Sequence, residues 1–309
     1  VMPSTGKLQL IAGKEDNSIK GYRSRYDKKT EIAKAGYYST ELIDYNIKVE
    51  STVAPHSGVL RFTFPENEQS RIQIDLARRV GGTSTKQYVK ILDEFTIQGW
   101  MKCNPDGGGW GNGAGKTDYT VYYYARFSKP IENYGIWSAD IPDDWSRKND
   151  EVVSLPYLSK IAQSQILSDK KELEGKHLGF FTEFPTDDSE EVTLKVGISF
   201  VDVEGAKKNF EAEVAEKDFD RIREEAQASW DQALGCLKVS GGSEDQKTIF
   251  YTALYHTMID PRTYMDVDGR YVGGDGKIHV GSDFTKRTIF SGWDVFCSQF
   301  PLQTIINPT

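Results

Sequence analysis

The spacing of apolar residues changes once along this chain, at about residue 204. Before that point, seven segments alternate apolar and polar side chains, and Gly, Pro, Asn and Asp separate them. A repeat of two with many β-branched and aromatic residues is typical of half-buried strands. Seven such strands with little helix between them predict an antiparallel β-sandwich. The segments are 45–54, 58–66, 70–78, 94–103, 118–128, 176–184 and 191–201.

After the change, apolar residues recur at steps of three and four, which predicts amphipathic helices. The first is expected over about 217–234. The second starts after Ser243, which forms a capping-box pattern with Gln246, and ends before Pro261. A third helix is expected over about 290–301.

Between these helices we expect a short strand within 236–242. A hairpin bracketed by the Asp-Gly steps 268–269 and 275–276 is also expected. The amphipathic helices need partners that cover their apolar faces, and the remaining length offers few. We therefore expect that the helical domain is cut short or is completed by something outside this chain.

The composition excludes some classes of partner. A net charge of −8 argues against a nucleic-acid partner, which requires clustered Lys and Arg. No apolar run approaches the roughly 20 residues that span a bilayer. Aromatic residues make up 12% of the chain, which favours β-structure and surfaces that stack on sugar rings. The three cysteines show no metal-binding spacing and are interpreted as buried or idle thiols.

Two loop motifs fail when their spacing is counted. The glycine-rich loop 106–117 ends like a phosphate-binding loop, but Trp110 stands at the required first glycine and a strand follows. We expect a flexible hairpin loop there, with Trp110 as a candidate for stacking on a sugar. The segment 266–276 begins like a calcium-binding EF-hand but carries Tyr271 at the position that needs glycine, so Asp-Gly turns are the preferred interpretation.

Trp293 and Asp294 form an unusual pair inside an apolar run. The neighbours Phe290, Val295, Phe296 and Phe300 predict that Asp294 is partly buried, and a buried carboxylate must be paired. Asp294 either braces the helix or accepts hydrogen bonds from the hydroxyls of a ligand. An indole face for C–H bonds beside a carboxylate for O–H groups suits a sugar.

Five segments together resemble glycoside hydrolase family 92, a family of bacterial exo-acting α-mannosidases. The most specific succession is FYTALYH, then DVDGRY, then the Trp-Asp pair. The resemblance runs along nearly the whole chain. The segments are 35–65, 122–130, 196–214, 230–279 and 290–296.

The resemblance implies an α+β multidomain fold, in which an antiparallel β-sandwich leads through a helical linker into an (α/α)6 barrel. The expected parts are the sandwich over 1–215, the linker over 216–242, and the truncated beginning of the catalytic barrel over 243–309. The family's general acid and base lie in later parts of the barrel, and its glycine- and histidine-rich opening segment is absent. The chain is thus expected to be an internal piece of a longer enzyme.

The implied activity is a calcium-dependent, inverting exo-α-mannosidase, α-1,2-mannosidase-like, that releases mannose from glycans such as N-glycans. Trp293 and Asp294 resemble the pair that lines the mannose pocket, and Cys297 stands where many members have Arg. Calcium is the implied cofactor and mannose-containing glycans are the implied partner. The implied location is secreted or periplasmic, with surface anchoring as a further option. The alternatives are a non-catalytic carbohydrate-binding β-sandwich module and a purely structural sandwich.

Overall fold

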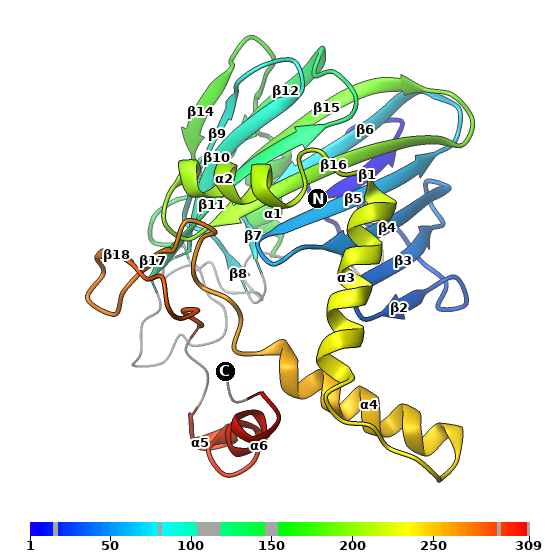
Figure 1. Ribbon diagram of the computed structural model, residues 1–309. Coiled ribbons are helices and arrows are strands. Elements are labelled where there is room, and N and C mark those ends of the chain that lie inside the picture. Colours follow the sequence, from blue (N-terminus) through cyan, green and yellow to red (C-terminus); the bar gives the residue numbers. More distant parts are fainter. Residues whose placement is uncertain (15–17, 80–81, 104–117, 146–153, 289–291, 308–309) are drawn as a thin grey trace.

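Two antiparallel sheets pack face to face in the computed structural model and form a β-sandwich, with helices extending from one end (Figure 1). The glycine-rich loop and Trp110 lie outside the described residues. The structure describes residues 1–14, 18–79, 82–103, 118–145, 154–288 and 292–307.

The larger sheet has nine strands in the order β14-β9-β10-β11-β16-β5-β4-β3-β2. Neighbouring strands are antiparallel throughout. In chain order the strands are β2 (Ile32–Lys34), β3 (Tyr37–Leu42), β4 (Ile47–Val53), β5 (Ser57–Phe64), β9 (Lys86–Ile91), β10 (Thr96–Cys103), β11 (Tyr119–Phe127), β14 (Glu172–Gly175) and β16 (Glu190–Ser199).

The smaller sheet has five strands in the order β1-β6-β15-β12-β13. All seven strands expected from the alternation are confirmed, five in the larger sheet and two, β6 and β15, in the smaller one. The five strands are β1 (Met2–Thr5), β6 (Asn67–Asp75), β12 (Asn133–Ser138), β13 (Ile166–Leu167) and β15 (Leu178–Thr186). A two-residue pair, β7 (Arg78–Arg79) and β8 (Gly82–Thr83), stands apart from both sheets.

The core lies between the two sheets, and this position explains why apolar and polar residues alternate along the strands. Phe62 and Phe64 point inward from β5, while Ile72 and Phe180 meet them from the smaller sheet. Because successive side chains of a strand point to opposite faces, every second residue enters this layer. The two sheets therefore bury each other's inward-facing apolar side chains.

Helices α2 (Val203–Glu213) and α3 (Phe219–Leu234) lie on the outer face of the nine-stranded sheet, the face turned away from the smaller sheet (Figure 1). A Cβ atom at Gly197 of β16 would lie 2.4 Å from the carbonyl oxygen of Ala206, so glycine is needed for α2 to approach the sheet this closely. At the corner between α2 and α3, the Lys195 ammonium donates to three backbone carbonyls at 2.9, 3.0 and 2.5 Å. These carbonyls belong to Val214, Ala215 and Lys217.

The remaining helices are α1 (Leu155–Ala162), α4 (Glu244–Ile259), α5 (Gly292–Val295) and α6 (Gln299–Ile306). The helix expected over 217–234 is confirmed as α3, and the capping box of Ser243 and Gln246 is present at the start of α4. None of the described helices is long and apolar enough to cross a membrane.

Three local expectations need correction. Residues 236–242 form no strand; they make an exposed connection in which Gly241 and Gly242 have positive φ. In place of a single helix over 290–301, the described part holds the two short helices α5 and α6. The hairpin consists of β17 (Arg270–Val272) and β18 (Ile278–Val280). The second Asp-Gly step lies within its turn and does not flank it.

Candidate functional site

Trp293 and Asp294 both lie on the short helix α5, at the far end of the molecule from the sandwich (Figure 1). The Trp293 side chain is 82% exposed and Asp294 is exposed as well, so the expected partial burial of Asp294 is wrong. The reason is that its apolar neighbours Phe296 and Phe300 are themselves exposed, and only Val295 packs inward.

No hydrogen bond or ion pair of the Asp294 carboxylate occurs among the residues that the structure describes. No described side chain or amide therefore uses this carboxylate as a brace. Both side chains are free to meet a ligand or further protein. Their role in binding mannose stays a prediction.

A groove of about 990 Å³ separates the helical part from the sandwich. Its walls come from the turn between β4 and β5, from α3, and from the facing ends of α4 and α6. Helix α6 is held to α4 by Gln299 and Gln303, whose amides donate to the carbonyl oxygen of Thr257 at 2.9 and 3.3 Å. Neither Trp293 nor Asp294 lines this groove.

His56 joins the sandwich to α2 beside this groove. Its backbone N–H donates to the Glu213 carboxylate at 2.9 Å, and its Nδ1 lies 2.6 Å from the other carboxylate oxygen. Burial alone lowers the pKa of His56, but the hydrogen bond and charge of Glu213 outweigh it and raise the pKa above its ordinary value. The pair therefore favours a charged imidazole at the junction of the two parts.

Asp266 is a second junction residue, which the sequence did not reveal. It is buried, and its carboxylate accepts hydrogen bonds from Ser199 Oγ at 2.7 Å and Asn209 Nδ2 at 2.9 Å. Burial raises the pKa of this carboxyl. Its partners lie 67 and 57 positions away along the chain, so only the folded topology brings them together.

Arg270 ties the same segment to α2. Its guanidinium donates to both carboxylate oxygens of Asp202, at 2.6 and 3.2 Å, and to Asp268 at 2.8 Å. Gly269 and Gly276 both have positive φ, which supports the interpretation of the segment as Asp-Gly turns. The run that superficially resembles an EF-hand thus fastens the hairpin to the sandwich side of the molecule.

Calcium does not fit the described residues on their own. Calcium takes six to eight oxygen ligands. Within the described ranges, no three acidic, histidine or cysteine side chains gather as a metal site would require.

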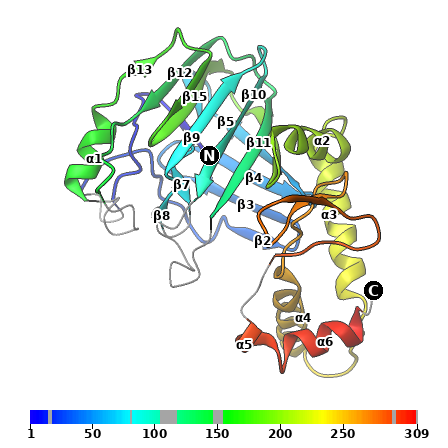
Figure 2. The same ribbon diagram turned by 90° about the vertical axis from the view of Figure 1, so that its left-hand side faces the viewer.

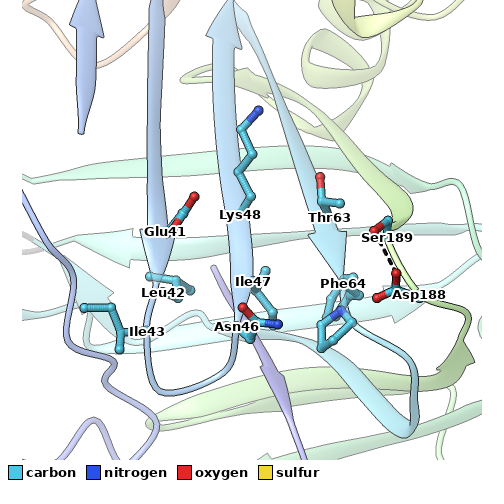
Figure 3. A pocket seen from close by; sticks show the side chains of 11 residues that line it. Glu41, Leu42, Ile43, Asn46, Ile47, Lys48, Thr63, Phe64, Asp188 and Ser189 are labelled. Carbon is cyan, nitrogen blue, oxygen red and sulfur yellow. Dashed lines mark hydrogen bonds between the residues drawn. The ribbon is translucent and has the colours of Figure 1, made fainter. Parts of the chain in front are cut away.

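A smaller cavity of about 210 Å³ opens at the edge of the sandwich, where the turn after β3 meets the ends of β4 and β5 (Figure 3). Leu42, Ile47 and Phe64 form its floor, and Glu41, Lys48 and Asp188 surround it. Its size suits a few water molecules, and no cluster of chemically reactive side chains lines it.

Comparisons with known proteins identify both halves of the chain. Residues 1–199 match the model described as "Glycosyl hydrolase family 92 N-terminal domain", and residues 205–309 match "Glycosyl hydrolase family 92 catalytic domain". A curated relative, an uncharacterised secreted glycosidase of Arthroderma benhamiae, is 26% identical over 279 residues, which is 85% of this chain and 34% of the relative.

The fold also matches solved structures. A family 92 α-mannosidase from Bacteroides thetaiotaomicron is 29% identical with a TM-score of 0.82, over 98% of this chain and 37% of that chain. That enzyme has also been solved with mannoimidazole bound. An inverting family 92 mannosidase of the same bacterium is 22% identical with a TM-score of 0.75, over 98% of this chain and 35% of that one, and this likeness shows the fold alone. The chain thus spans about a third of the length of the proteins it matches.

Proposed function

The chain belongs to glycosyl hydrolase family 92, and we propose that it is part of an exo-acting α-mannosidase that releases mannose from glycans. One observation carries this proposal. Both family models match in order along nearly the whole chain, and an α-mannosidase of known structure superposes on 98% of it. The sandwich and the first helices are therefore present in the arrangement of such an enzyme.

We assign substrate binding within this chain to Trp293 and Asp294. The indole face of Trp293 would pack against the C–H bonds of a terminal mannose, and the Asp294 carboxylate would accept hydrogen bonds from its hydroxyls. The exposure of both side chains supports this role. If further residues of the full-length protein complete the pocket, the two side chains that form its wall here must be accessible in this chain.

The proposed reaction is hydrolysis with inversion. It needs a general acid and a general base whose carboxyl groups stand roughly 6.5–9.5 Å apart, which leaves room for the attacking water. We place both outside these 309 residues. Calcium is proposed as the cofactor on the same family grounds, and at least part of its ligand set would have to come from outside the described residues. A secreted or periplasmic location is proposed because a curated relative is described as secreted.

The test uses the full-length protein and a panel of linkage-defined α-mannobiosides, with and without a calcium chelator. Mannose release that the chelator abolishes is the expected result. Asp294→Ala should lower kcat/KM by about two orders of magnitude or more. The substrate hydroxyls that the carboxylate would bind are then left without a hydrogen-bond partner in the site. Asp283→Ala, which removes another exposed carboxylate, is the matched control and should leave kcat/KM unchanged.

Two outcomes would contradict the proposal. Wild-type kinetics for Asp294→Ala would remove Asp294 from the pocket. Binding of α-mannosides by the full-length protein without any hydrolysis would favour a non-catalytic carbohydrate-binding module.

A further inference from the structure

One part of the outer face of the nine-stranded sheet is free of the described helices. Helix α2 packs over β16 and β11, and α3 packs over β3, β4 and β5. Strands β14, β9 and most of β10 lie beyond both helices, as Figure 2 shows for β9 and β10. Their outward side chains would be expected to be polar, because this face of the sheet meets water.

A row of three aromatic residues crosses this face. Trp100 of β10 is directly opposite Tyr88 of β9 on one side and Tyr122 of β11 on the other. The rings of Tyr88 and Trp100 have centroids 6.0 Å apart and planes within 21° of each other. All three side chains are half-buried. Cross-strand aromatic pairs stabilise sheets, so the row alone does not indicate a ligand.

The polar groups beside the row supply the second observation. On the neighbouring strand β14, Glu172 accepts a hydrogen bond from the Tyr88 hydroxyl at 2.8 Å and lies 3.3 Å from the Lys90 ammonium. Glu174, directly opposite Tyr88, pairs with Lys86. These four charged side chains are about half exposed, so they offer donors and acceptors to a molecule lying on the rings.

The charges indicate which class of ligand fits. Lys102 of β10, directly opposite Lys86, adds a third ammonium group to the two carboxylates and two ammonium groups above. The excess is one positive charge, which is too small to select a polyanion or a polycation. A flat apolar surface edged by both donors and acceptors suits a neutral sugar ring, which has C–H faces and hydroxyl edges.

The surface is also held in place before any ligand arrives. The hydrogen bond to Glu172 fixes the Tyr88 ring, which in turn packs on Trp100. A Cβ atom at Gly99 would lie 1.9 Å from the carbonyl oxygen of Tyr88, so a side chain at this position of β10 would clash with β9. Rigid rings lose little conformational entropy on binding.

We propose that the outer face of β9, β10 and β14 is a carbohydrate-binding surface, in which a neutral hexose packs on Trp100 and Tyr88 and bonds to Glu172, Glu174, Lys86 and Lys90. The choice of mannose-containing glycan as its ligand rests on the proposed function. The surface lies on the sandwich, away from α5 in both views (Figures 1 and 2). It would hold a branched glycan while Trp293 and Asp294 engage a terminal residue.

The experiment measures how soluble α-mannan retards the full-length protein in native affinity gels. Trp100→Ala is expected to weaken the retardation by about tenfold, the equivalent of one well-packed aromatic contact. Tyr26→Ala removes another exposed aromatic side chain of the sandwich part and should change nothing. The same comparison in an Asp294→Ala background isolates the outer face from the Trp293–Asp294 pair.

A second variant guards against misfolding of Trp100→Ala. Glu172→Gln changes an exposed side chain and should weaken the retardation while the thermal unfolding temperature stays the same. Wild-type retardation for both folded variants, or no retardation of the unaltered protein, would overturn the proposal. Hydrolysis of a small aryl α-mannoside, measured in parallel, tests the proposed function separately, because that substrate is too small to span both places.

Discussion

The sandwich and the terminal helices of this chain differ in how far they bury their apolar side chains. Between the two sheets, a continuous cluster of side chains such as Phe62, Ile72 and Phe180 is almost wholly removed from water. By contrast, α4 buries only Leu254, and α6 buries no residue among those described. Ile249 and Ile305 are 68% and 77% exposed.

The difference shows what a local pattern does and does not guarantee. A strand in a sandwich finds its partner sheet within the same 200 residues, so its pattern and its burial agree. A helical pattern predicts only that some partner exists, because helical stability in proteins comes mostly from packing. In α4 the apolar residues are not gathered on one face, so the expected amphipathic character of this helix is wrong. Among the described residues, α4 to α6 find few such partners.

The largest expected effect sets a core residue against a helix residue. Phe62→Ala should lower the free energy of unfolding of this chain by about 3–5 kcal/mol, because it opens a cavity in a filled layer. Phe296→Ala should change it by less than about 0.5 kcal/mol, since that ring is already exposed. Urea denaturation of both variants measures the contrast, and equal losses would break it.

The next effect concerns Arg61 of β5, which donates to Asp220 of α3 at 3.1 Å and so links that helix to the sheet. Arg61 donates to both carboxylate oxygens of Glu50, at 2.9 and 3.0 Å, and the Glu50 side chain is only 3% exposed. Arg61→Ala should cost about 1.5–3 kcal/mol, because Glu50 keeps only Tyr37 and Lys48 as partners. Arg221→Ala, which removes an exposed pair with Glu225 on α3, is the control and should be nearly silent.

The same carboxylate predicts an acid dependence. Burial opposes ionisation of Glu50, but the hydrogen bonds from Arg61 and Tyr37 prevail and lower its pKa to about 2. A lowered pKa gives stability that is present above the ordinary value of 4.5 and is lost as pH falls towards 2. Glu50→Gln should flatten the fall in unfolding temperature over that window, and an unchanged slope would contradict the assignment.

The junction at His56 should respond in the opposite direction. Because Glu213 raises the pKa of His56, the pair contributes stability at low pH, and this contribution is lost as pH rises above 6.5 through the folded-state value. His56→Gln should abolish this part of the pH dependence between pH 6 and pH 9, whereas His279→Gln, on the exposed hairpin, should preserve it.

The smallest effect tests the independence of the terminal helices. Ser243→Ala removes the hydroxyl that accepts from the backbone N–H of Gln246 and should cost about 1 kcal/mol locally. Hydrogen exchange should accelerate at the first turn of α4, while the urea midpoint of the sandwich stays constant. A shift of that midpoint would show that α4 and the sandwich unfold together.

Local signals were sufficient for the long elements. The seven alternating segments and α3 were predictable because each repeats its pattern over seven or more residues. Helix α2 was missed because Phe210 is the one large apolar residue of its buried face. The others are small or polar, such as Gly205 and Asn209, and give no apolar repeat. The two-turn helix α1 and the two-residue strand β13 are too short to show a period.

The candidate site was less predictable than the fold. The family resemblance pointed to Trp293 and Asp294, but the apolar neighbours of Asp294 gave a wrong expectation of burial in this chain. Asp266 and its partners come from three separate segments, and no spacing rule connects them. What sequence missed is the set of long-range polar contacts between the sandwich and the segment after α4.

Lys195 fixes the backbone at the corner between α2 and α3. Its stem belongs to β16, a strand in the middle of the nine-stranded sheet, and its ammonium grips the carbonyls where the chain turns. The sheet therefore determines the direction in which α3 leaves the corner, because a side chain of the sheet holds the backbone there. The position of a pocket formed by later helices would then depend on β16, through this corner and α3.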